Sequence, residues 1–392
     1  MKKVLFMVSS MNIGGVEKSL LSLLSELPNN KYDITVLLLE KKGDFLEYIP
    51  EWVKVEEASW FGTMKAIILQ PPQQTIKDYI KNKQFFKIPL FISTYFLSKY
   101  LNNRYLYYKN VFKSIPFNNS TYDVAITYQG PTDIIDYYIG NRVKATKKIS
   151  WVHFDISKHN VNKKLYEKLY KKFNNIYVVS KEARERLIEE IPTVKNKAEV
   201  FKNLVPTNLI KKMSKETIIF DETYQGIKIV TVGRLSKEKG QDLAIKVLSK
   251  LLKNGYEVRW YCIGEGNSRR KYEMLINDYD IKNNFFLLGS TPNPYPYIAK
   301  ADIYVQTSRH EGYCLTLAEA KCLQKPIITT NFTGAREQLK DGFNGLIVDF
   351  DEEDLYKKIK YLIDFPLQRK KLSENLQKNN ENSYMKIKKV SL

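Results

Sequence analysis

The sequence is poor in the residues that build disulfide frameworks and metal sites. It holds three cysteines and three histidines among 392 residues. The cysteines, Cys262, Cys314 and Cys322, are odd in number and have no metal-ligand spacing. We therefore expect reduced thiols in the cytoplasm, with neither a disulfide scaffold nor a metal site.

Long apolar runs are missing as well. A membrane-spanning helix needs about 20 consecutive apolar residues, and every apolar stretch in this chain is well below that length. The run Val4–Val8 near the N-terminus leads into a polar glycine loop without a small-residue cleavage site. We therefore expect a first β-strand there and not a signal peptide.

Length and hydrophobic content indicate two domains. A chain of 392 residues exceeds one ordinary core, and a hydrophobic content of 43% can fill two cores. We predict a first domain over residues 1–205, a polar linker over 206–225 and a second domain over 226–376. Residues 377–392 are expected to form a C-terminal tail or helix.

Predicted strands and helices alternate along the chain. Strands are expected at Val4–Val8, Ile34–Leu39, Val124–Thr127, Lys148–Val152, Ile176–Val179, Glu199–Phe201, Ile229–Val232, Val258–Ile263, Phe285–Leu288, Ile303–Val305, Pro326–Thr329 and Leu346–Val348. Such alternation predicts an α/β fold with doubly wound parallel sheets. Ligands of these sheets bind beyond the carboxyl ends of the strands.

The most informative stretch runs from Ser308 to Cys322, a predicted strand end, a glycine turn and a helix start. The free N–H groups and partial positive charge of a helix N-terminus suit a phosphate. Gly312 lets the backbone approach such a ligand, and Glu311 and Glu319 can accept hydrogen bonds from sugar and ribose hydroxyls. The stretch suits a nucleotide sugar, although an ordinary strand-to-helix connection also fits these residues.

A second strand, glycine and helix segment, Val230–Gly240, carries two cations in its turn. The fork of Arg234 and the point charge of Lys239 suit the two phosphates of a diphosphate. Two solvated surface cations are the alternative. In the first half, Gly14 and Gly15 allow a turn that faces an interdomain cleft, although a plain loop fits them as well.

Together these segments resemble the family 4 retaining glycosyltransferases of the GT-B fold, of the type that builds bacterial cell-surface polysaccharides such as capsule. The resemblance rests on Gly14-Gly15-Val16-Glu17, Gly233-Arg234 with Lys239-Gly240, Gly264-Glu265-Gly266, the pair Glu311 and Glu319 with seven residues between them, and Asp341–Val348. It is most specific over residues 226–350.

The resemblance implies two Rossmann-like domains that face a cleft, and the transfer of a hexose from a UDP-sugar to a glycan or lipid-linked acceptor. It implies that the leaving phosphate takes the acceptor proton without a metal, and that the last helix returns to the first domain. The implied catalytic residues are Glu311, His153, Arg234 and Lys239. The implied donor-binding residues are Gly14, Gly15, Gly233, Gly264, Gly266, Gly312, Tyr313, Cys314, Leu315 and Glu319.

Two other classes of function share this pattern. A sugar-nucleotide epimerase or hydrolase of the same fold would bind the donor without an acceptor. A non-catalytic partner subunit would keep the fold and lose site residues, whereas Arg234, Lys239, Glu311 and Glu319 are all present. For His153 a structural role in the cleft is the alternative.

Positive charge is the other strong signal. The formal net charge is +20, and the segment 61–120 has nine Lys and Arg residues against one acid, Asp78, with aromatic residues interleaved. We expect a helical insert whose basic aromatic face contacts an anionic membrane at the cytoplasmic side. A solvated face is the second interpretation. Nucleic acid ranks last because no nucleic-acid-binding module is present.

Overall fold

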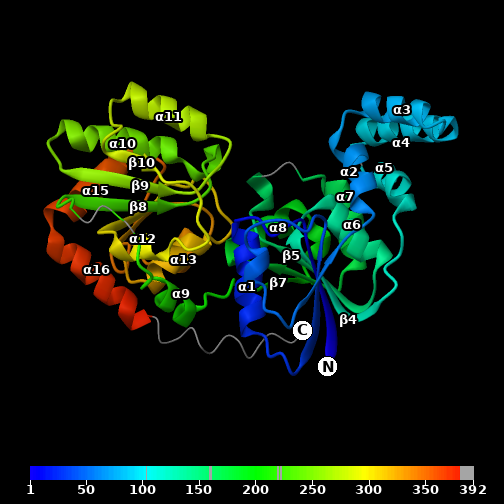
Figure 1. The fold of residues 1–392 in the computed structure, drawn as a ribbon, viewed down its shortest axis with the longest axis horizontal. Helices are drawn as coiled ribbons and strands as arrows, with labels where there is room; N and C mark the ends of the chain where they lie inside the picture. Colours follow the sequence, from blue (N-terminus) through cyan, green and yellow to red (C-terminus); the bar gives the residue numbers. More distant parts are fainter. Residues whose placement is uncertain (103, 159–160, 219, 221–222, 380–392) are drawn as a thin grey trace.

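The computed structural model describes residues 1–102, 104–158, 161–218, 220 and 223–379. These residues form two α/β domains that face each other (Figure 1). The first contains a seven-stranded parallel sheet in the order β3-β2-β1-β4-β5-β6-β7. Its strands are β1 (Lys2–Val8), β2 (Tyr32–Leu38), β3 (Lys54–Glu57), β4 (Thr121–Gly130), β5 (Lys144–Val152), β6 (Asn175–Val178) and β7 (Ala198–Val200).

Helices cover both faces of the first sheet. Alternate residues of β1 point to opposite faces, so Val4 and Phe6 pack with α1 while Leu5 and Met7 pack in the core on the other side. The helices of this half are α1 (Gly15–Glu26), α2 (Phe61–Leu69), α3 (Pro72–Lys81), α4 (Ile88–Tyr100), α5 (Tyr105–Val111), α6 (Asp133–Arg142), α7 (Lys163–Leu169) and α8 (Lys181–Glu190).

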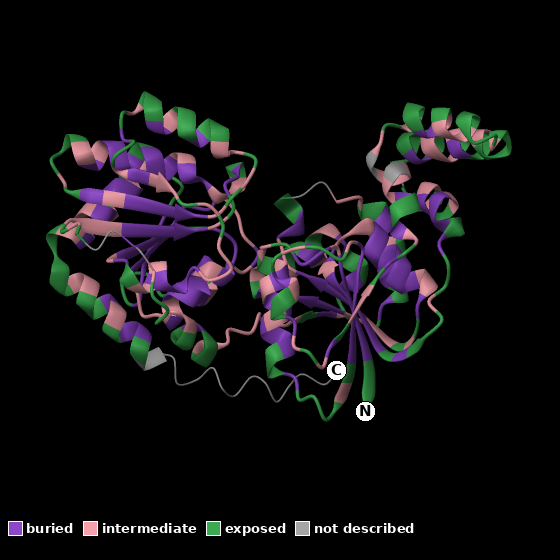
Figure 2. Cartoon of the chain, viewed as in Figure 1, coloured by how far each residue is buried: buried purple, intermediate pink, exposed green. Residues whose placement is uncertain are grey.

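The predicted basic insert is helical. Helices α2 to α5 connect β3 to β4, and α3 and α4 project away from the sheet (Figure 1). Their surface is largely exposed, in contrast to the purple interior of both sheets (Figure 2). None of the helices in the described part of the chain is long and apolar enough to cross a bilayer.

The second domain contains a six-stranded parallel sheet in the order β10-β9-β8-β11-β12-β13. Its strands are β8 (Ile227–Val232), β9 (Val258–Ile263), β10 (Phe285–Leu287), β11 (Ile303–Gln306), β12 (Ile327–Thr330) and β13 (Leu346–Val348). One face packs against α10 (Gln241–Lys253), α11 (Arg269–Asp278) and α15 (Glu352–Asp364). The other packs against α9 (Thr207–Met213), α12 (Tyr295–Lys300), α13 (Leu315–Cys322) and α14 (Ala335–Gln338), and α16 (Pro366–Asn379) contributes Leu372 and Leu376 to the two cores.

The predicted fold class, two doubly wound parallel sheets facing a cleft, is confirmed. Every predicted strand is present, but β3 was not predicted. Its sequence, Lys-Val-Glu-Glu, has the charged character of an edge strand and lacks an apolar run. The segment expected as a linker contains α9, whose Ile210 is fully buried in the second domain. Of the expected tail, residues 380–392 lie outside the described residues.

Candidate active site between the domains

A cavity of about 630 Å³ lies between the two domains. The first domain lines it with the loops that follow β1 and β5, and the second domain lines it with the loops that follow β8, β9 and β11. These loops all leave the carboxyl ends of parallel strands, where ligands of such sheets bind. The predicted motifs therefore lie together, because the carboxyl ends of the strands in one sheet face the carboxyl ends of the strands in the other.

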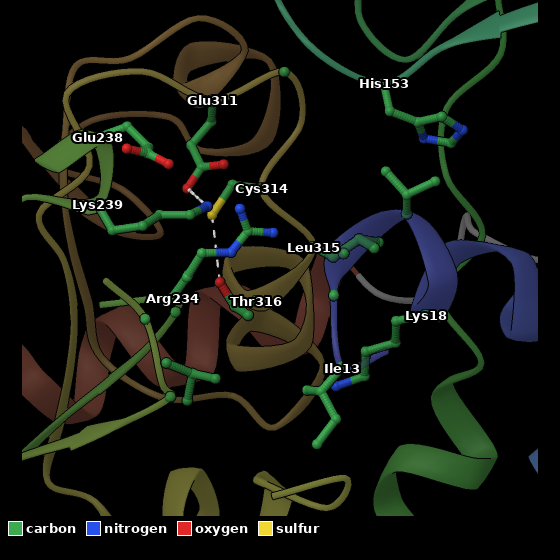
Figure 3. A pocket seen from close by; sticks show the side chains of 18 of the residues that line it. Ile13, Lys18, His153, Arg234, Glu238, Lys239, Glu311, Cys314, Leu315 and Thr316 are labelled. Atoms are coloured by element: carbon green, nitrogen blue, oxygen red, sulfur yellow. Dashed lines mark hydrogen bonds and ion pairs between the residues drawn. The ribbon is translucent and has the colours of Figure 1, made fainter. Parts of the chain in front are cut away.

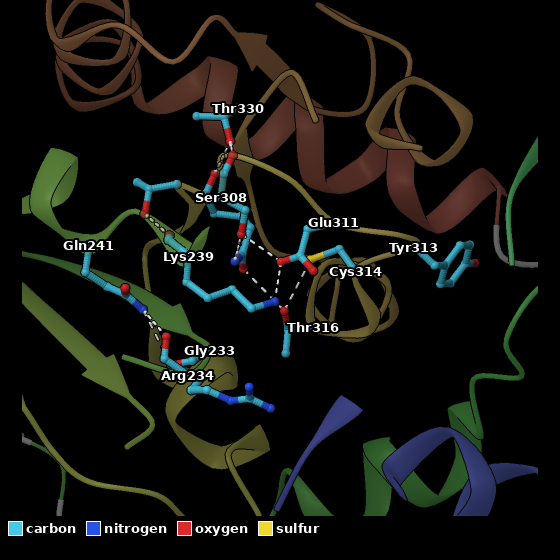
Figure 4. Close-up of polar contacts among 12 residues, drawn as sticks. Gly233, Arg234, Lys239, Gln241, Ser308, Glu311, Tyr313, Cys314, Thr316 and Thr330 are labelled. Atoms are coloured by element: carbon cyan, nitrogen blue, oxygen red, sulfur yellow. Dashed lines mark hydrogen bonds and ion pairs between the residues drawn. The ribbon is translucent and has the colours of Figure 1, made fainter. Parts of the chain in front are cut away.

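Lys239 and Glu311 form the central ion pair of the cavity (Figure 4). Glu311 Oε1 accepts hydrogen bonds from Lys239 Nζ at 2.5 Å and from Ser308 Oγ at 2.7 Å. Burial acts to lower the pKa of Lys239, but the carboxylate of Glu311 outweighs it and raises that pKa above its ordinary value. Lys239 is therefore a fixed positive charge in the cavity.

Arg234 brings a second positive charge to the same wall (Figure 3). Its carbonyl accepts a hydrogen bond of 2.9 Å from Gln241 Nε2, which holds the turn after β8 against the start of α10. Among the described residues, none forms a hydrogen bond with the guanidinium group of Arg234. That group is therefore available for an anionic ligand.

The N-terminus of α13 lines the same cavity as these two cations. Cys314 caps the helix in the left-handed conformation, with φ of 60°, a conformation that is uncommon for a residue with a Cβ. Burial raises the pKa of its thiol, so Cys314 is a neutral side chain. The unpaired N–H groups of the first helical turn add partial positive charge beside Arg234 and Lys239.

Gly312 allows the two domains to touch. A Cβ on this residue would lie 2.2 Å from the carbonyl oxygen of His153 in the first domain. The structure thus gives Gly312 a second reason to lack a side chain, besides the predicted close approach of a ligand. Although Gly312 lines the cavity, the group that excludes a side chain is the backbone of the opposite domain.

His153 faces the cavity from the end of β5 (Figure 3). Its ring stacks on Trp151, with centroids 5.9 Å apart and an angle of 12° between the planes. Burial lowers the pKa of His153 to about 3, so the ring is neutral near pH 7. Its Nε2 atom is shielded from solvent and has no hydrogen-bond partner among the described residues. A ligand hydroxyl could supply that partner.

Glu319 is the one predicted site residue that does not line the cavity. Its side chain is buried on α13, where Oε1 lies 2.9 Å from Lys18 Nζ and accepts a hydrogen bond of 3.2 Å from the Tyr295 hydroxyl. Its Oε2 atom has no hydrogen-bond partner among the described residues. The carboxylate of Glu319, which is predicted to bind the ribose, is thus covered by Lys18 of the opposite domain.

The other predicted site residues are brought together. They are Gly14, Gly15, His153, Gly233, Arg234, Lys239, Gly264, Gly266, Glu311, Gly312, Tyr313, Cys314 and Leu315, and all line the cavity. Three further residues, Lys18, Asp155 and Asn203, line the cavity without having been predicted as site residues. Lys18 follows the glycine loop by one helical turn, a position that could have drawn attention to it.

Several contacts join the domains beside the cavity. Asp155 Oδ2 accepts a hydrogen bond of 2.9 Å from Thr333 Oγ1. The backbone N–H of Glu182 donates to Glu337 at 3.0 Å, and the N–H of Gly334 donates to Glu182 at 3.1 Å. Two helix N-termini, those of α8 and α14, are therefore each capped by a glutamate from the other domain.

No acidic metal site emerges from the described residues, which hold no group of three or more His, Cys, Asp or Glu side chains suited to a metal ion. The pair Asp349 and Asp351 has the spacing of a metal motif, but Asp351 caps α15 by accepting a hydrogen bond of 2.9 Å from the Asp354 N–H. Its role in the structure is that of a helix cap.

Comparison with known proteins relates the second domain to one family. Residues 214–380 match the family described as glycosyl transferases group 1. A 4-alpha-N-acetylgalactosaminyltransferase of Campylobacter jejuni, named for a diphospho-undecaprenol-linked acceptor, is 29% identical over 230 residues, covering 58% of this chain and 61% of that protein. The poly(glycerol-phosphate) alpha-glucosyltransferase of Bacillus subtilis is 27% identical over 198 residues, covering 50% and 29%. The matches thus span less than two thirds of these relatives.

Solved structures resemble the whole chain. The structure of HepE from Anabaena in complex with UDP-glucose matches with a TM-score of 0.68 and 17% identity, covering 96% of this chain and 94% of that one. A structure of TarM from S. aureus in complex with UDP matches with a TM-score of 0.70 and 15% identity, covering 97% and 96%. At this identity the likeness concerns the fold, which is GT-B.

Proposed function

We propose that this chain, whose residues 214–380 match the glycosyl transferases group 1, transfers a hexose from a UDP-sugar to an acceptor hydroxyl with retention of the anomeric configuration. The observation that carries the proposal is the cavity itself. Arg234, Lys239 and the N-terminus of α13 lie on one wall with Glu311, and His153 faces the cavity from the opposite domain. This is the arrangement that a diphosphate joined to a sugar requires.

The diphosphate would bind to the cations and to the backbone N–H groups of α13. UDP is the proposed leaving group because similar structures were solved with UDP and UDP-glucose. Glu311 uses Oε1 for Lys239 and Ser308, which leaves Oε2 for sugar hydroxyls. The neutral ring of His153 would hydrogen-bond the sugar through Nε2 from the opposite domain.

Charge stabilisation would supply most of the catalysis. As the bond between the anomeric carbon and the β-phosphate oxygen breaks, negative charge develops on UDP, and preorganised cations and N–H groups stabilise it. The acceptor oxygen then bonds to the anomeric carbon on the same face. The departing phosphate oxygen accepts the proton of the acceptor hydroxyl, so no protein base is required.

The proposed acceptor is a glycan or lipid-linked glycan of a cell-surface polysaccharide. The relative from Campylobacter jejuni is named for a diphospho-undecaprenol-linked saccharide, and the relative from Bacillus subtilis is named for poly(glycerol-phosphate). Such an acceptor would place the chain at the inner face of the cell membrane, as a peripheral protein.

Binding and turnover can be tested separately. The purified chain is screened against UDP-sugars and GDP-sugars by thermal shift, because a ligand raises the melting temperature according to its concentration relative to Kd. The stabilising sugar nucleotide is then incubated with and without lipid-linked acceptors, and the products are analysed by mass spectrometry. Formation of an epimer or free sugar at the same rate without any acceptor would replace the proposal with the epimerase or hydrolase function.

A further inference from the structure

A helical arm projects from the first domain. We define it as residues 72–101, which comprise α3, the turn after it and α4. The two helices pack against each other through Tyr79 and Phe91, whose ring centroids are 5.7 Å apart. The arm extends away from both sheets (Figure 1), and most of its surface is exposed (Figure 2).

Helix α4 carries apolar residues on its outer side. Only Phe91 and Ser98 of this helix are buried. Phe96 and Tyr100, one turn apart, are 62% and 89% exposed, and Phe86 in the preceding turn is 76% exposed. Of 20 large hydrophobic side chains exposed in the described part of the chain, ten lie between Ile80 and Phe117. An apolar surface of this kind marks an interaction site.

Positive charge surrounds this apolar surface. The arm contains five lysines, all exposed, and none of them forms an ion pair within the described residues. They are Lys77, Lys81, Lys83, Lys87 and Lys99. The single acid of the arm, Asp78, accepts hydrogen bonds from Gln70 and Gln74. No further Asp or Glu occurs before Asp123.

We propose that the arm is a membrane-docking element that inserts its outward aromatic side chains into the interface of an anionic bilayer. A second copy of the chain would bring its own unpaired lysines against the lysines of this arm, and like charges repel. An anionic lipid surface satisfies both features, because headgroups attract the lysines while Phe and Tyr rings favour the boundary between headgroups and acyl chains. This inference concerns a surface away from the cavity, and it stands whether or not the sugar transfer is correct.

The apolar contribution distinguishes insertion from simple electrostatic attraction. Attraction to charged headgroups weakens at high salt, whereas burial of aromatic rings persists. Co-sedimentation with vesicles of phosphatidylcholine, with and without phosphatidylglycerol, is measured at low and high salt. We expect wild type to prefer the anionic vesicles and to keep part of its binding at high salt.

Two sets of variants separate the contributions. Phe86→Ser, Phe96→Ser and Tyr100→Ser together should weaken high-salt binding by about tenfold or more. Lys81→Gln, Lys83→Gln and Lys87→Gln together should remove the preference for anionic vesicles. Leu367→Ser on α16, where the side chain is 80% exposed, is the matched control and should bind as wild type. Thermal melts check that each variant is folded.

A probe at the arm tests insertion directly. Because Cys262, Cys314 and Cys322 are buried, Phe86→Cys and Leu367→Cys can be labelled with a polarity-sensitive fluorophore. A blue shift on anionic vesicles at residue 86 and none at 367 is the expected result. Unchanged emission at residue 86 on bound protein, or vesicle binding that ignores the serine variants, would overturn the proposal. So would a self-association in analytical ultracentrifugation that the serine variants abolish.

Discussion

Lys18 and Glu319 form an ion pair across the domain interface, with 2.9 Å between Nζ and Oε1. Lys18 belongs to α1 of the first domain, and its ammonium group also lies 4.4 Å from the ring centroid of Tyr295. Glu319 is buried, and its second oxygen has no partner among the described residues. In the proposed reaction, ribose hydroxyls would have to share or replace this contact, so Lys18 would link nucleotide binding to the position of the domains.

Lys18→Met should therefore tighten the binding of UDP, by about threefold to tenfold, because the nucleotide no longer competes with an ammonium group for Glu319. Without nucleotide the variant should be less stable, since a buried carboxylate has lost its partner. Calorimetric titration and thermal melts measure the two effects. Lys42→Met, which removes an exposed pair with Glu40, is the control. Weaker UDP binding in the Lys18 variant would assign Lys18 to the nucleotide itself.

Glu319→Ala should chiefly weaken nucleotide affinity, because the proposed partner of Glu319 is the ribose and not the transferred sugar. Titration with free UDP provides the measurement. Equal affinity in wild type and Glu319→Ala would exclude the ribose role, and the buried contact with Lys18 would then be purely structural.

Glu311→Gln should reduce kcat more than it reduces the affinity for UDP, because its proposed ligand is the sugar. The amide keeps the side-chain size but loses the ion pair with Lys239. Turnover and UDP titration are compared on the same preparation. A loss confined to UDP binding would contradict the assignment.

Arg234→Ala and Lys239→Ala should each lower kcat/KM. The loss should correspond to about 2–4 kcal/mol of transition-state stabilisation, the effect of losing one charge-stabilising donor. Lys237→Ala is a matched control, since Lys237 lies in the same turn but is exposed outside the cavity. Activities of both variants within threefold of wild type would remove the diphosphate role.

The pH dependence of stability should carry a contribution from His153. Burial lowers its pKa from 6.5 to about 3, so the unfolded chain binds a proton between these values while the folded chain does not. This contribution to folding free energy is fully present above pH 6.5 and is lost as the pH falls toward 3, at up to about 1.4 kcal/mol per pH unit. Urea unfolding of wild type and His153→Phe at several pH values measures it, and identical pH slopes would refute the buried neutral state.

The succession of elements was predictable from local sequence. Parallel strands buried on both faces are short apolar runs, so Val258–Ile263 and Leu346–Val348 were predicted with the bounds that they have. Glycine turns followed by helix starts also predicted that Arg234, Lys239 and Glu311 lie close together, because the carboxyl ends of parallel strands lie at one edge of a sheet, and all three line the same cavity. The edge strand β3 escaped prediction because its residues are charged and only partly buried.

Contacts between the domains were beyond local sequence. Lys18 covers Glu319, and Gly312 lies against His153, only because the two sheets are placed with their carboxyl ends opposed. The arm shows the same limit. Its cations and aromatic residues are visible in the sequence, but a helix such as α4 could have buried its apolar side. Periodicity describes one element at a time, whereas burial and pairing depend on which element packs against it, and that is a property of the assembled fold.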